Sequence, residues 1–238
     1  MKYKKLSIII PCYNEEKTIE LLLKKVFSAK SWGLKKEVIV VNDGSSDQTR
    51  KILKKLQKQK KFKLITQAKN LGKTAALKVG ISKSTGDIVL IQDADLEYDP
   101  SEYEILIKPI ITGQADVVYG SRFVSGKVHR VLYFWHSLFN RSLTFLSNVF
   151  SNINLTDMEV GYKLIKGDLA RKLATQLTST GFGFEPEITA RLAKIENIRF
   201  YEVGISYYGR TYQQGKHIRW SDGLKAVWQI IKYNVFVN

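Results

Sequence analysis

Short apolar strands alternate with amphipathic helices through the first half of this 238-residue chain, and this alternation limits the folds open to it. Residues 6–11 form an apolar run typical of a buried strand, and a helix that opens at Asn14 carries apolar residues at helical spacing through Phe27. Further strands are expected at 37–41, at 62–65, from Ile88 and at 116–119, and further helices around 52–56, at 75–81 and near Ile105. Short connections between such elements predict an α/β fold, with a mostly parallel sheet and helices on both faces.

Size and composition predict one domain over residues 1–238. A hydrophobic content of 44% is enough for a sizeable core. The single cysteine, Cys12, excludes an internal disulfide and is expected to be a buried, inert thiol. The basic N-terminus lacks the apolar run of a signal peptide, and no stretch is apolar enough to span a membrane. A cytoplasmic location is therefore expected.

The formal net charge of +16 indicates acidic partners. Nucleic acid, an anionic membrane surface and phosphorylated substrates all qualify. The lysines are spread over residues 51–63 and the C-terminal third, without an arginine-rich tail, zinc-ligand spacing or an RNA-binding aromatic signature. A solvated basic surface accounts for most of them, and nucleic acid is not expected as a partner.

Three acidic residues at alternate positions follow the strand that starts at Ile88. If this segment is extended, Asp93, Asp95 and Glu97 lie on one side of it, and their negative charges require a cation. Mg²⁺ or Mn²⁺ prefers oxygen ligands and often joins carboxylates to substrate phosphates. The alternative is a plain acidic turn after a strand, because the residues from Asp99 onward are a good turn and helix-start signal.

Three polar segments are expected to converge at one edge of the sheet. In parallel sheets ligands bind at the carboxyl ends of the strands, and residues 11–15, 42–44 and 93–95 all fall there. Two common nucleotide motifs are not met: the GxGxxG pattern is absent, and a P-loop ending at Lys73 would need glycine where Gln67 stands. Lys73 itself follows a glycine and precedes a helix, so it is either a phosphate ligand or a solvated lysine.

Four motifs in order resemble those of family-2 glycosyltransferases with the GT-A fold, a Rossmann-like architecture. The resemblance is closest to the polyprenyl-phosphate branch, which includes dolichol-phosphate mannose synthases and their glucosyl relatives, and it extends over about residues 6–220. The motifs occupy residues 11–15, 41–49, 70–73 and 92–100.

The resemblance implies a binding site for a nucleotide diphosphate sugar such as GDP-mannose or UDP-glucose. The base and ribose would be held by Pro11, Tyr13, Glu15 and Asp43. Lys73 would lie near the diphosphate, and Asp93 and Asp95 would hold Mg²⁺ or Mn²⁺. Glu97, a further metal-ligand candidate, stands where some members of the family have glutamine.

The second half of the chain, from about residue 121, carries the expected acceptor site. Ser121 and Arg122 resemble the family segment that approaches an acceptor phosphate, and an arginine fork suits phosphate oxygens. The alternative for Arg122 is a salt bridge at a strand end. Asp157, with Glu159 nearby, matches the acidic motif before the last core strand. Since a phosphate acceptor is already an anion, Asp157 would orient groups instead of removing a proton.

A later loop would complete that site. By resemblance, Arg210 and Lys216 lie in the family's loop over the donor and acceptor phosphates. A basic exposed loop is the alternative.

Residues 131–150 predict an amphipathic helix. Its apolar face is expected to carry Val131, Trp135, Leu138, Phe145 and Val149, and its polar face Ser137, Arg141, Thr144 and Asn148. Such a helix can lie in a bilayer interface, with the basic residues Lys127, His129 and Arg130 beside it, or pack on the core. A C-terminal segment with Leu224, Val227, Trp228 and Ile231 offers the same two possibilities.

These features together predict an inverting, metal-dependent enzyme that transfers a hexose from a nucleotide diphosphate sugar to a polyprenyl phosphate, working peripherally at the inner face of the cell membrane. Asp95, Asp157, Arg122 and Arg210 are the expected catalytic residues. One alternative is transfer to a sugar hydroxyl of a cell-surface polysaccharide or glycolipid. A basic nucleic-acid-binding module is another, but it leaves the acidic strand end without a role.

Overall fold

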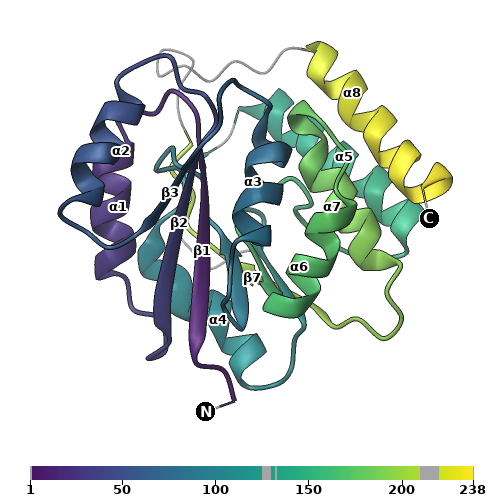
Figure 1. Cartoon of the computed structure of the whole chain (residues 1–238). Helices are drawn as coiled ribbons and strands as arrows, with labels where there is room; N and C mark the ends of the chain where they lie inside the picture. The colour runs from purple at the N-terminus through teal and green to yellow at the C-terminus, as the bar shows by residue number, and fades with distance from the viewer. Residues whose placement is uncertain (1, 125–129, 132, 210–219, 238) are drawn as a thin grey trace.

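The computed structural model describes residues 2–124, 130–131, 133–209 and 220–237. Strands and helices alternate in the first half of the chain (Figure 1): β1 (Lys5–Cys12), α1 (Ile19–Ser28), β2 (Lys35–Asn42), α2 (Thr49–Gln57), β3 (Lys63–Thr66), α3 (Lys73–Ser82), β4 (Ile88–Ile91), α4 (Tyr103–Ile111) and β5 (Val117–Ser121). The second half contains α5 (Phe134–Ser151), β6 (Lys163–Lys166), α6 (Gly167–Gln176), α7 (Phe184–Ala193), β7 (Phe200–Gly204) and α8 (Trp220–Ile231). Short helical turns occupy Pro100–Glu102, Gly181–Gly183 and Lys232–Phe236.

The described strands form one seven-stranded sheet in the order β3-β2-β1-β4-β6-β5-β7. Strand β6 is antiparallel to both of its neighbours, and all other pairs are parallel. The predicted mostly parallel sheet is therefore confirmed. Strand β7 has no counterpart among the predicted elements, and β6 separates β4 from β5.

The central strand β1 shows that helices cover both faces of the sheet. Ile8, Ile9 and Ile10 point alternately to opposite faces, and all three are fully buried. Helix α3 covers the face of Ile9 closely, since a Cβ on Gly80 would lie 2.4 Å from the Ile9 Cγ2 atom. This tight packing fixes the start of α3 at the carboxyl edge of the sheet.

The first predicted helix starts later than expected. Asn14 has a positive φ of 53°, and the chain forms a turn before α1 begins at Ile19. That turn leaves residues 13–16 at the carboxyl end of β1, where they are available to a binding site.

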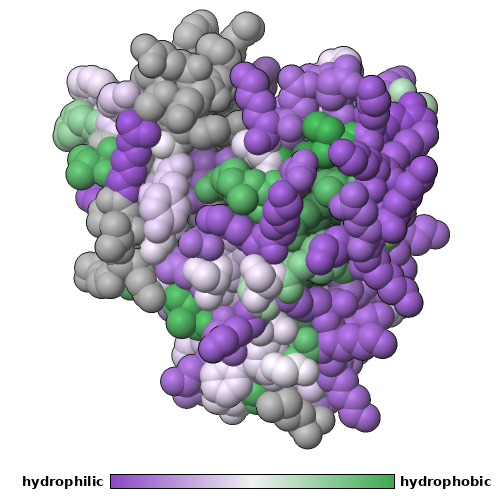
Figure 2. Space-filling model, turned by 90° about the vertical axis from the view of Figure 1, so that its left-hand side faces the viewer, coloured by the Kyte–Doolittle hydropathy of each residue, from purple (hydrophilic) through white to green (hydrophobic). Residues whose placement is uncertain are grey.

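Helix α2 carries much of the positive charge on its outer face. Lys51, Lys54, Lys55 and Lys58 are exposed, whereas Leu53 is buried. Figure 2 shows that side of the molecule as mostly hydrophilic, with hydrophobic side chains confined to smaller areas. These lysines form a solvated face, as the simpler interpretation of the charge predicts.

Helix α5 presents its apolar side chains outward. The predicted apolar residues Val131, Trp135, Leu138, Phe145 and Val149 are between 44% and 87% exposed. Part of its polar face points inward instead, although Arg141 is exposed: Thr144 is buried and accepts a hydrogen bond from the Met158 N–H, and Asn148 exchanges two hydrogen bonds with the Leu155 backbone. Core packing of the predicted apolar face is thereby excluded.

Helix α8 lies beside α5 (Figure 1) and repeats this exposure. Leu224 and Trp228 of α8 are exposed, as are Val235 and Phe236 beyond it, whereas Ile230 is buried. Within the described residues, no helix has both the length and the apolar character needed to cross a bilayer.

Candidate active site

A cavity of about 380 Å³ opens at the carboxyl edge of the sheet, where β1, β2 and β4 end and α3 begins. Seven of the predicted site residues line it: Pro11, Tyr13, Glu15, Asp43, Lys73, Asp93 and Asp95. They come from four separate segments of the chain. The structure therefore brings the predicted nucleotide-sugar-binding residues together.

Two loops of this cavity are joined by hydrogen bonds between them. The Asn14 N–H donates to the Ser45 hydroxyl, and the Asn14 side-chain carbonyl accepts from the Ser46 N–H. The left-handed conformation of Asn14 makes these contacts possible, and asparagine tolerates it better than most residues. The ends of β1 and β2 are thus held as one rigid wall.

Asp43 organises the loop that leads into α3. Its two carboxylate oxygens accept the N–H groups of Leu71 and Gly72, each at 2.8 Å. Gly44 permits this approach, because a Cβ there would lie 2.4 Å from the Lys69 carbonyl carbon. Asp43 thus holds the loop that forms one side of the cavity. Its expected contact with a base or ribose stays a prediction.

Lys73, the first residue of α3, lies between two carboxylates. Its Nζ is 2.9 Å from Asp93 Oδ1 and 2.8 Å from Glu185 Oε1. Burial alone would lower the pKa of Lys73, but the two carboxylates outweigh it and hold the pKa well above its usual value. Lys73 is therefore a charged group inside the cavity, and the solvated-lysine alternative is excluded.

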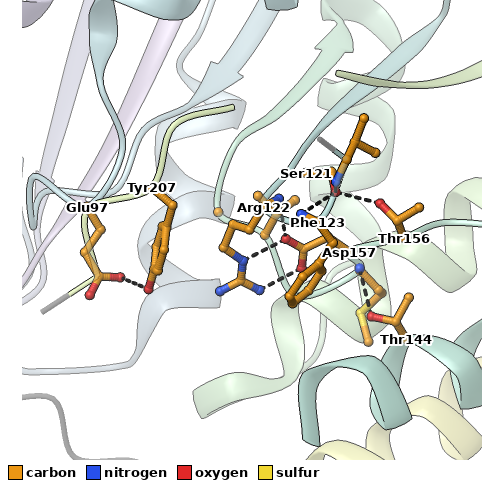
Figure 3. A network of polar contacts seen from close by, with 12 residues as sticks. Glu97, Ser121, Arg122, Phe123, Thr144, Thr156, Asp157 and Tyr207 are labelled. Carbon is orange, nitrogen blue, oxygen red and sulfur yellow. Dashed lines mark hydrogen bonds and ion pairs between the residues drawn. The ribbon is translucent and has the colours of Figure 1, made fainter. Parts of the chain in front are cut away.

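The acidic segment after β4 is a turn, and the prediction of an extended segment was wrong. The strand ends at Ile91, Leu96 has a φ of +64°, and the Asp95 carboxylate accepts the Glu97 N–H at 3.1 Å. The Glu97 carboxylate is directed to Tyr207, whose hydroxyl donates to it at 2.8 Å (Figure 3). The three carboxylates consequently do not share one side of a strand.

Two of these carboxylates fit a divalent ion. Asp93 and Asp95 both line the cavity and supply the hard oxygen donors that Mg²⁺ or Mn²⁺ prefers. Within the described parts of the chain, no three acidic, histidine or cysteine side chains are arranged to hold a metal by themselves. An ion here would therefore need water or substrate oxygens as further ligands, and the place of Glu97 among its ligands finds no support in this geometry.

Gly161 positions Asp93, a role that its motif did not reveal. A Cβ at Gly161 would lie 2.0 Å from Asp93 Oδ2. The Gly161 N–H donates to the Tyr98 hydroxyl at 2.9 Å, which holds the backbone in place. A side chain of any size at this position would displace the carboxylate.

Arg122 and Asp157 form a buried ion pair beside the cavity (Figure 3). The Arg122 Nε and Nη2 atoms each donate to the Asp157 carboxylate at 2.7 Å, and the Arg122 backbone N–H donates to it at 3.0 Å. Burial would lower the pKa of the Arg122 guanidinium, but Asp157 raises it well above its usual value. Arg122 is therefore salt-bridged at a strand end, which was the structural alternative for this residue; an additional role toward an acceptor stays a prediction.

Of the other predicted acceptor residues, only Ser121 lies within the described part of the chain. Ser121 is buried, and its hydroxyl lies 2.6 Å from the Thr156 hydroxyl (Figure 3). Arg210 and Lys216 lie outside the described residues, as do the expected basic neighbours Lys127 and His129. The acceptor site is thus only partly described.

Two buried charged residues were assigned no role from the sequence. Glu185, from α7, holds Lys73 as described above. Lys163, from β6, is fully buried and donates to the Met158 and Val160 carbonyls. Burial lowers the pKa of Lys163. No motif surrounds Glu185, and Lys163 ends the acidic motif that contains Asp157 but was assigned no role in it. Only the three-dimensional packing reveals the contacts of these two side chains.

Glu159 is the third buried charge near the cavity. Its Oε1 atom is buried and has no hydrogen-bond partner within the described residues. Burial, together with repulsion from Glu185, raises the pKa of the Glu159 carboxyl. Because a carboxyl that is already protonated cannot accept a proton, the raised pKa makes Glu159 a poor general base at neutral pH.

Comparisons with known proteins find relatives along nearly the whole chain. Over 233 residues the chain is 28% identical to the dolichol-phosphate mannosyltransferase of Pyrococcus furiosus, which covers 96% of the chain and 64% of that protein. A dolichyl-phosphate beta-glucosyltransferase of Trichomonas vaginalis is 26% identical over 244 residues, covering 97% of the chain and 73% of that protein.

The fold is shared with solved structures. Glucosyl-3-phosphoglycerate synthase from Mycobacterium tuberculosis, in complex with Mn²⁺, uridine diphosphate and phosphoglyceric acid, superposes with a TM-score of 0.69 at 19% identity, covering 97% of this chain and 77% of that one. This likeness confirms the GT-A fold. Residues 7–174 match glycosyl transferase family 2. The match covers more than half of the chain, which therefore belongs to this family of glycosyltransferases.

Proposed function

We propose that this enzyme transfers a hexose, with inversion, from a nucleotide diphosphate sugar to a polyprenyl phosphate. The observation that carries the proposal is the cavity in which Lys73, Asp93 and Asp95 meet at the carboxyl edge of the sheet. One cation and two carboxylates at the start of a helix suit a diphosphate bound together with a divalent ion. The relatives named as dolichyl-phosphate mannosyl- and glucosyltransferases support the acceptor class.

The donor would occupy the cavity along its length. Pro11, Tyr13, Glu15 and Asp43 would surround the base and ribose, and Lys73 would neutralise the diphosphate. Asp93 and Asp95 would hold Mg²⁺ or Mn²⁺, which supplies positive charge to the leaving diphosphate. The protein's own part is to hold these groups at fixed positions, since Asp43 and Gly161 constrain the loop and the carboxylate that matter most.

The acceptor phosphate would approach from the side of β5. Arg122, together with Ser121, Arg210 and Lys216, would hold it against the anomeric carbon. Asp157 already accepts two hydrogen bonds from the Arg122 side chain, so its carboxylate would orient that guanidinium. A phosphate acceptor needs no base, which is consistent with an aspartate engaged in this way.

The outer faces of α5 and α8 would rest on the lipid surface that supplies the acceptor. Trp135 and Phe145 on α5 and Trp228 on α8 are exposed, and Thr144 on the polar face of α5 is turned to the protein. Aromatic side chains of this kind bury well at the boundary of headgroups and acyl chains. The enzyme would thus be peripheral, at the cytoplasmic face of the cell membrane.

A panel of nucleotide sugars, assayed with and without polyprenyl phosphate, tests the proposal. We expect sugar transfer from one nucleotide sugar, such as GDP-mannose or UDP-glucose, to polyprenyl phosphate, with Mg²⁺ or Mn²⁺ required. The nucleoside diphosphate with metal should also raise the melting temperature, and duplex DNA should not. Efficient transfer to a soluble glycan, with polyprenyl phosphate ignored, would instead identify a sugar hydroxyl as the acceptor.

A further inference from the structure

The ion pair between Lys73 and Glu185 connects the two halves of the chain. Lys73 belongs to α3 in the first half and Glu185 to α7 in the second, 112 residues apart. The same surfaces meet again nearby: the Thr74 hydroxyl lies 3.0 Å from the Ser179 hydroxyl, and the Lys78 Nζ donates to the Leu177 carbonyl. The position of Glu185 relative to Lys73 is therefore fixed by packing on both sides.

The partner of Lys73 on the other side is a proposed metal ligand. Its Nζ lies 2.9 Å from Asp93 Oδ1. A divalent ion bound to the same oxygen would strongly repel the ammonium group of Lys73. The other carboxylate oxygen, Oδ2, packs against Gly161, so an ion at Asp93 requires Lys73 to leave Oδ1. The Glu185 carboxylate, 2.8 Å away on the opposite side and with a nearly buried side chain, is the group that can keep the ammonium paired when this happens.

We propose that Lys73 excludes metal from Asp93 until a diphosphate draws it away, and that Glu185 is the positioning residue about which Lys73 turns. Lys73 bridges Asp93 and Glu185 in the structure. A donor diphosphate offers Lys73 new oxygens, Asp93 is released to the ion, and Glu185 retains the ammonium beside the phosphate. Metal and nucleotide consequently bind together, and the empty enzyme holds metal weakly. The proposal rests on the donor site assigned above.

The decisive measurement is Mn²⁺ affinity without nucleotide, read from the paramagnetic resonance signal of free Mn²⁺. Lys73→Met should raise this affinity at least about tenfold, the lower end of what one adjacent charge does to proton binding at a carboxylate. The same variant should lower the affinity for nucleoside diphosphate measured by calorimetry. A purely structural role would move both affinities in the same direction.

Glu185→Gln supplies the second arm. The amide keeps an oxygen for Lys73 but loses the charge, so Lys73 should stay on Asp93 more firmly. We expect weaker Mn²⁺ binding without nucleotide and a higher KM for the nucleotide sugar, whereas Glu185→Asp should restore part of both. Lys78→Met is the matched control, because it removes a positive charge from the same helix at a side chain that contacts the Leu177 carbonyl and, among the residues that the structure describes, no carboxylate.

The outcomes separate this proposal from the proposed function. If wild-type enzyme binds no nucleoside diphosphate with metal, the donor site itself is wrong. If it does, and Lys73→Met leaves Mn²⁺ affinity unchanged or lowers it, or Lys78→Met raises it equally, Lys73 does not exclude the metal. An increase confined to Lys73→Met, with the opposite change in Glu185→Gln, supports the proposal.

Discussion

The cavity around Lys73 and the ion pair of Arg122 lie at the same edge of the sheet, but their polar groups are satisfied in different ways. Around the cavity, backbone N–H groups hold Asp43, and Asp93 and Asp95 line the open space, with Asp93 paired to Lys73. Beside it, Arg122 and Asp157 satisfy each other and are almost fully buried. The proposed donor side thus offers polar groups around an open cavity, whereas the proposed acceptor side is stabilised as a part of the core.

This difference predicts that Arg122→Ala mainly lowers the free energy of unfolding. Removing one partner of a buried ion pair leaves the other charge uncompensated, which typically costs about 3–5 kcal/mol. Chemical denaturation should show a loss of this size. Arg199→Ala is the control, because its similar pair with Asp116 is more exposed and exposed pairs contribute about 0.2–1 kcal/mol. Equal losses in the two variants would contradict the comparison.

Asp95→Asn should leave stability unchanged and lower activity, the opposite of what is expected for Arg122→Ala. The amide oxygen can still accept the Glu97 N–H, so the melting temperature should stay within a few degrees of wild type. Loss of a charged metal ligand should lower the rate of transfer by at least about a hundredfold. Substitutions of residues that only orient a metal ligand already lower activity by up to about that factor. If turnover of the variant at saturating Mn²⁺ equals that of the wild type, Asp95 is not a metal ligand.

Gly161→Ala sharpens the comparison by moving Asp93 without changing it. The added Cβ displaces this carboxylate, and we expect roughly a tenfold loss of metal-dependent activity, within the range for disturbed ligand positioning. Gly80→Ala serves as its control, since its Cβ would press on Ile9 and disturb packing alone. Should both variants lose stability equally and keep full activity, Gly161 has no part in placing Asp93.

The outer face of α5 should give the smallest effect on folding. Trp135→Ser and Phe145→Ser remove exposed side chains, so the free energy of unfolding should change by no more than about 0.5 kcal/mol. Binding to vesicles should nevertheless weaken in a flotation assay, because each side chain loses apolar contact with lipid. If vesicle binding is unchanged and the variants alter a monomer–dimer equilibrium instead, this face contacts a second copy of the chain.

The sequence predicts the donor side better than the acceptor side, for a physical reason. Residues 11–15, 42–44 and 93–95 each follow a strand directly, so the parallel order of the strands is enough to bring them together. The direction of Glu97 depends on one residue, Leu96, in a left-handed conformation that leucine rarely adopts. Nothing in the local pattern announces such a turn.

Longer-range features were also beyond the sequence. Glu185 meets Lys73 only because the segment between α6 and α7 packs against α3, and no motif marks this contact. Helical spacing in residues 131–150 reveals two faces but does not say which one points inward. Thr144 and Asn148 settle that question through hydrogen bonds to the segment before β6, which becomes visible only in three dimensions.

The position of β6 in the sheet has a consequence for synthesis on the ribosome. Strand β5 pairs only with β6 and β7, and β4 has an open edge until β6 joins it, although β4 and β5 both precede residue 122. A nascent chain that has not yet reached Lys163 therefore exposes the apolar strand Val117–Ser121 with no neighbour to pair with. Unpaired strands of this kind invite association with other chains, so premature termination products should aggregate or recruit chaperones.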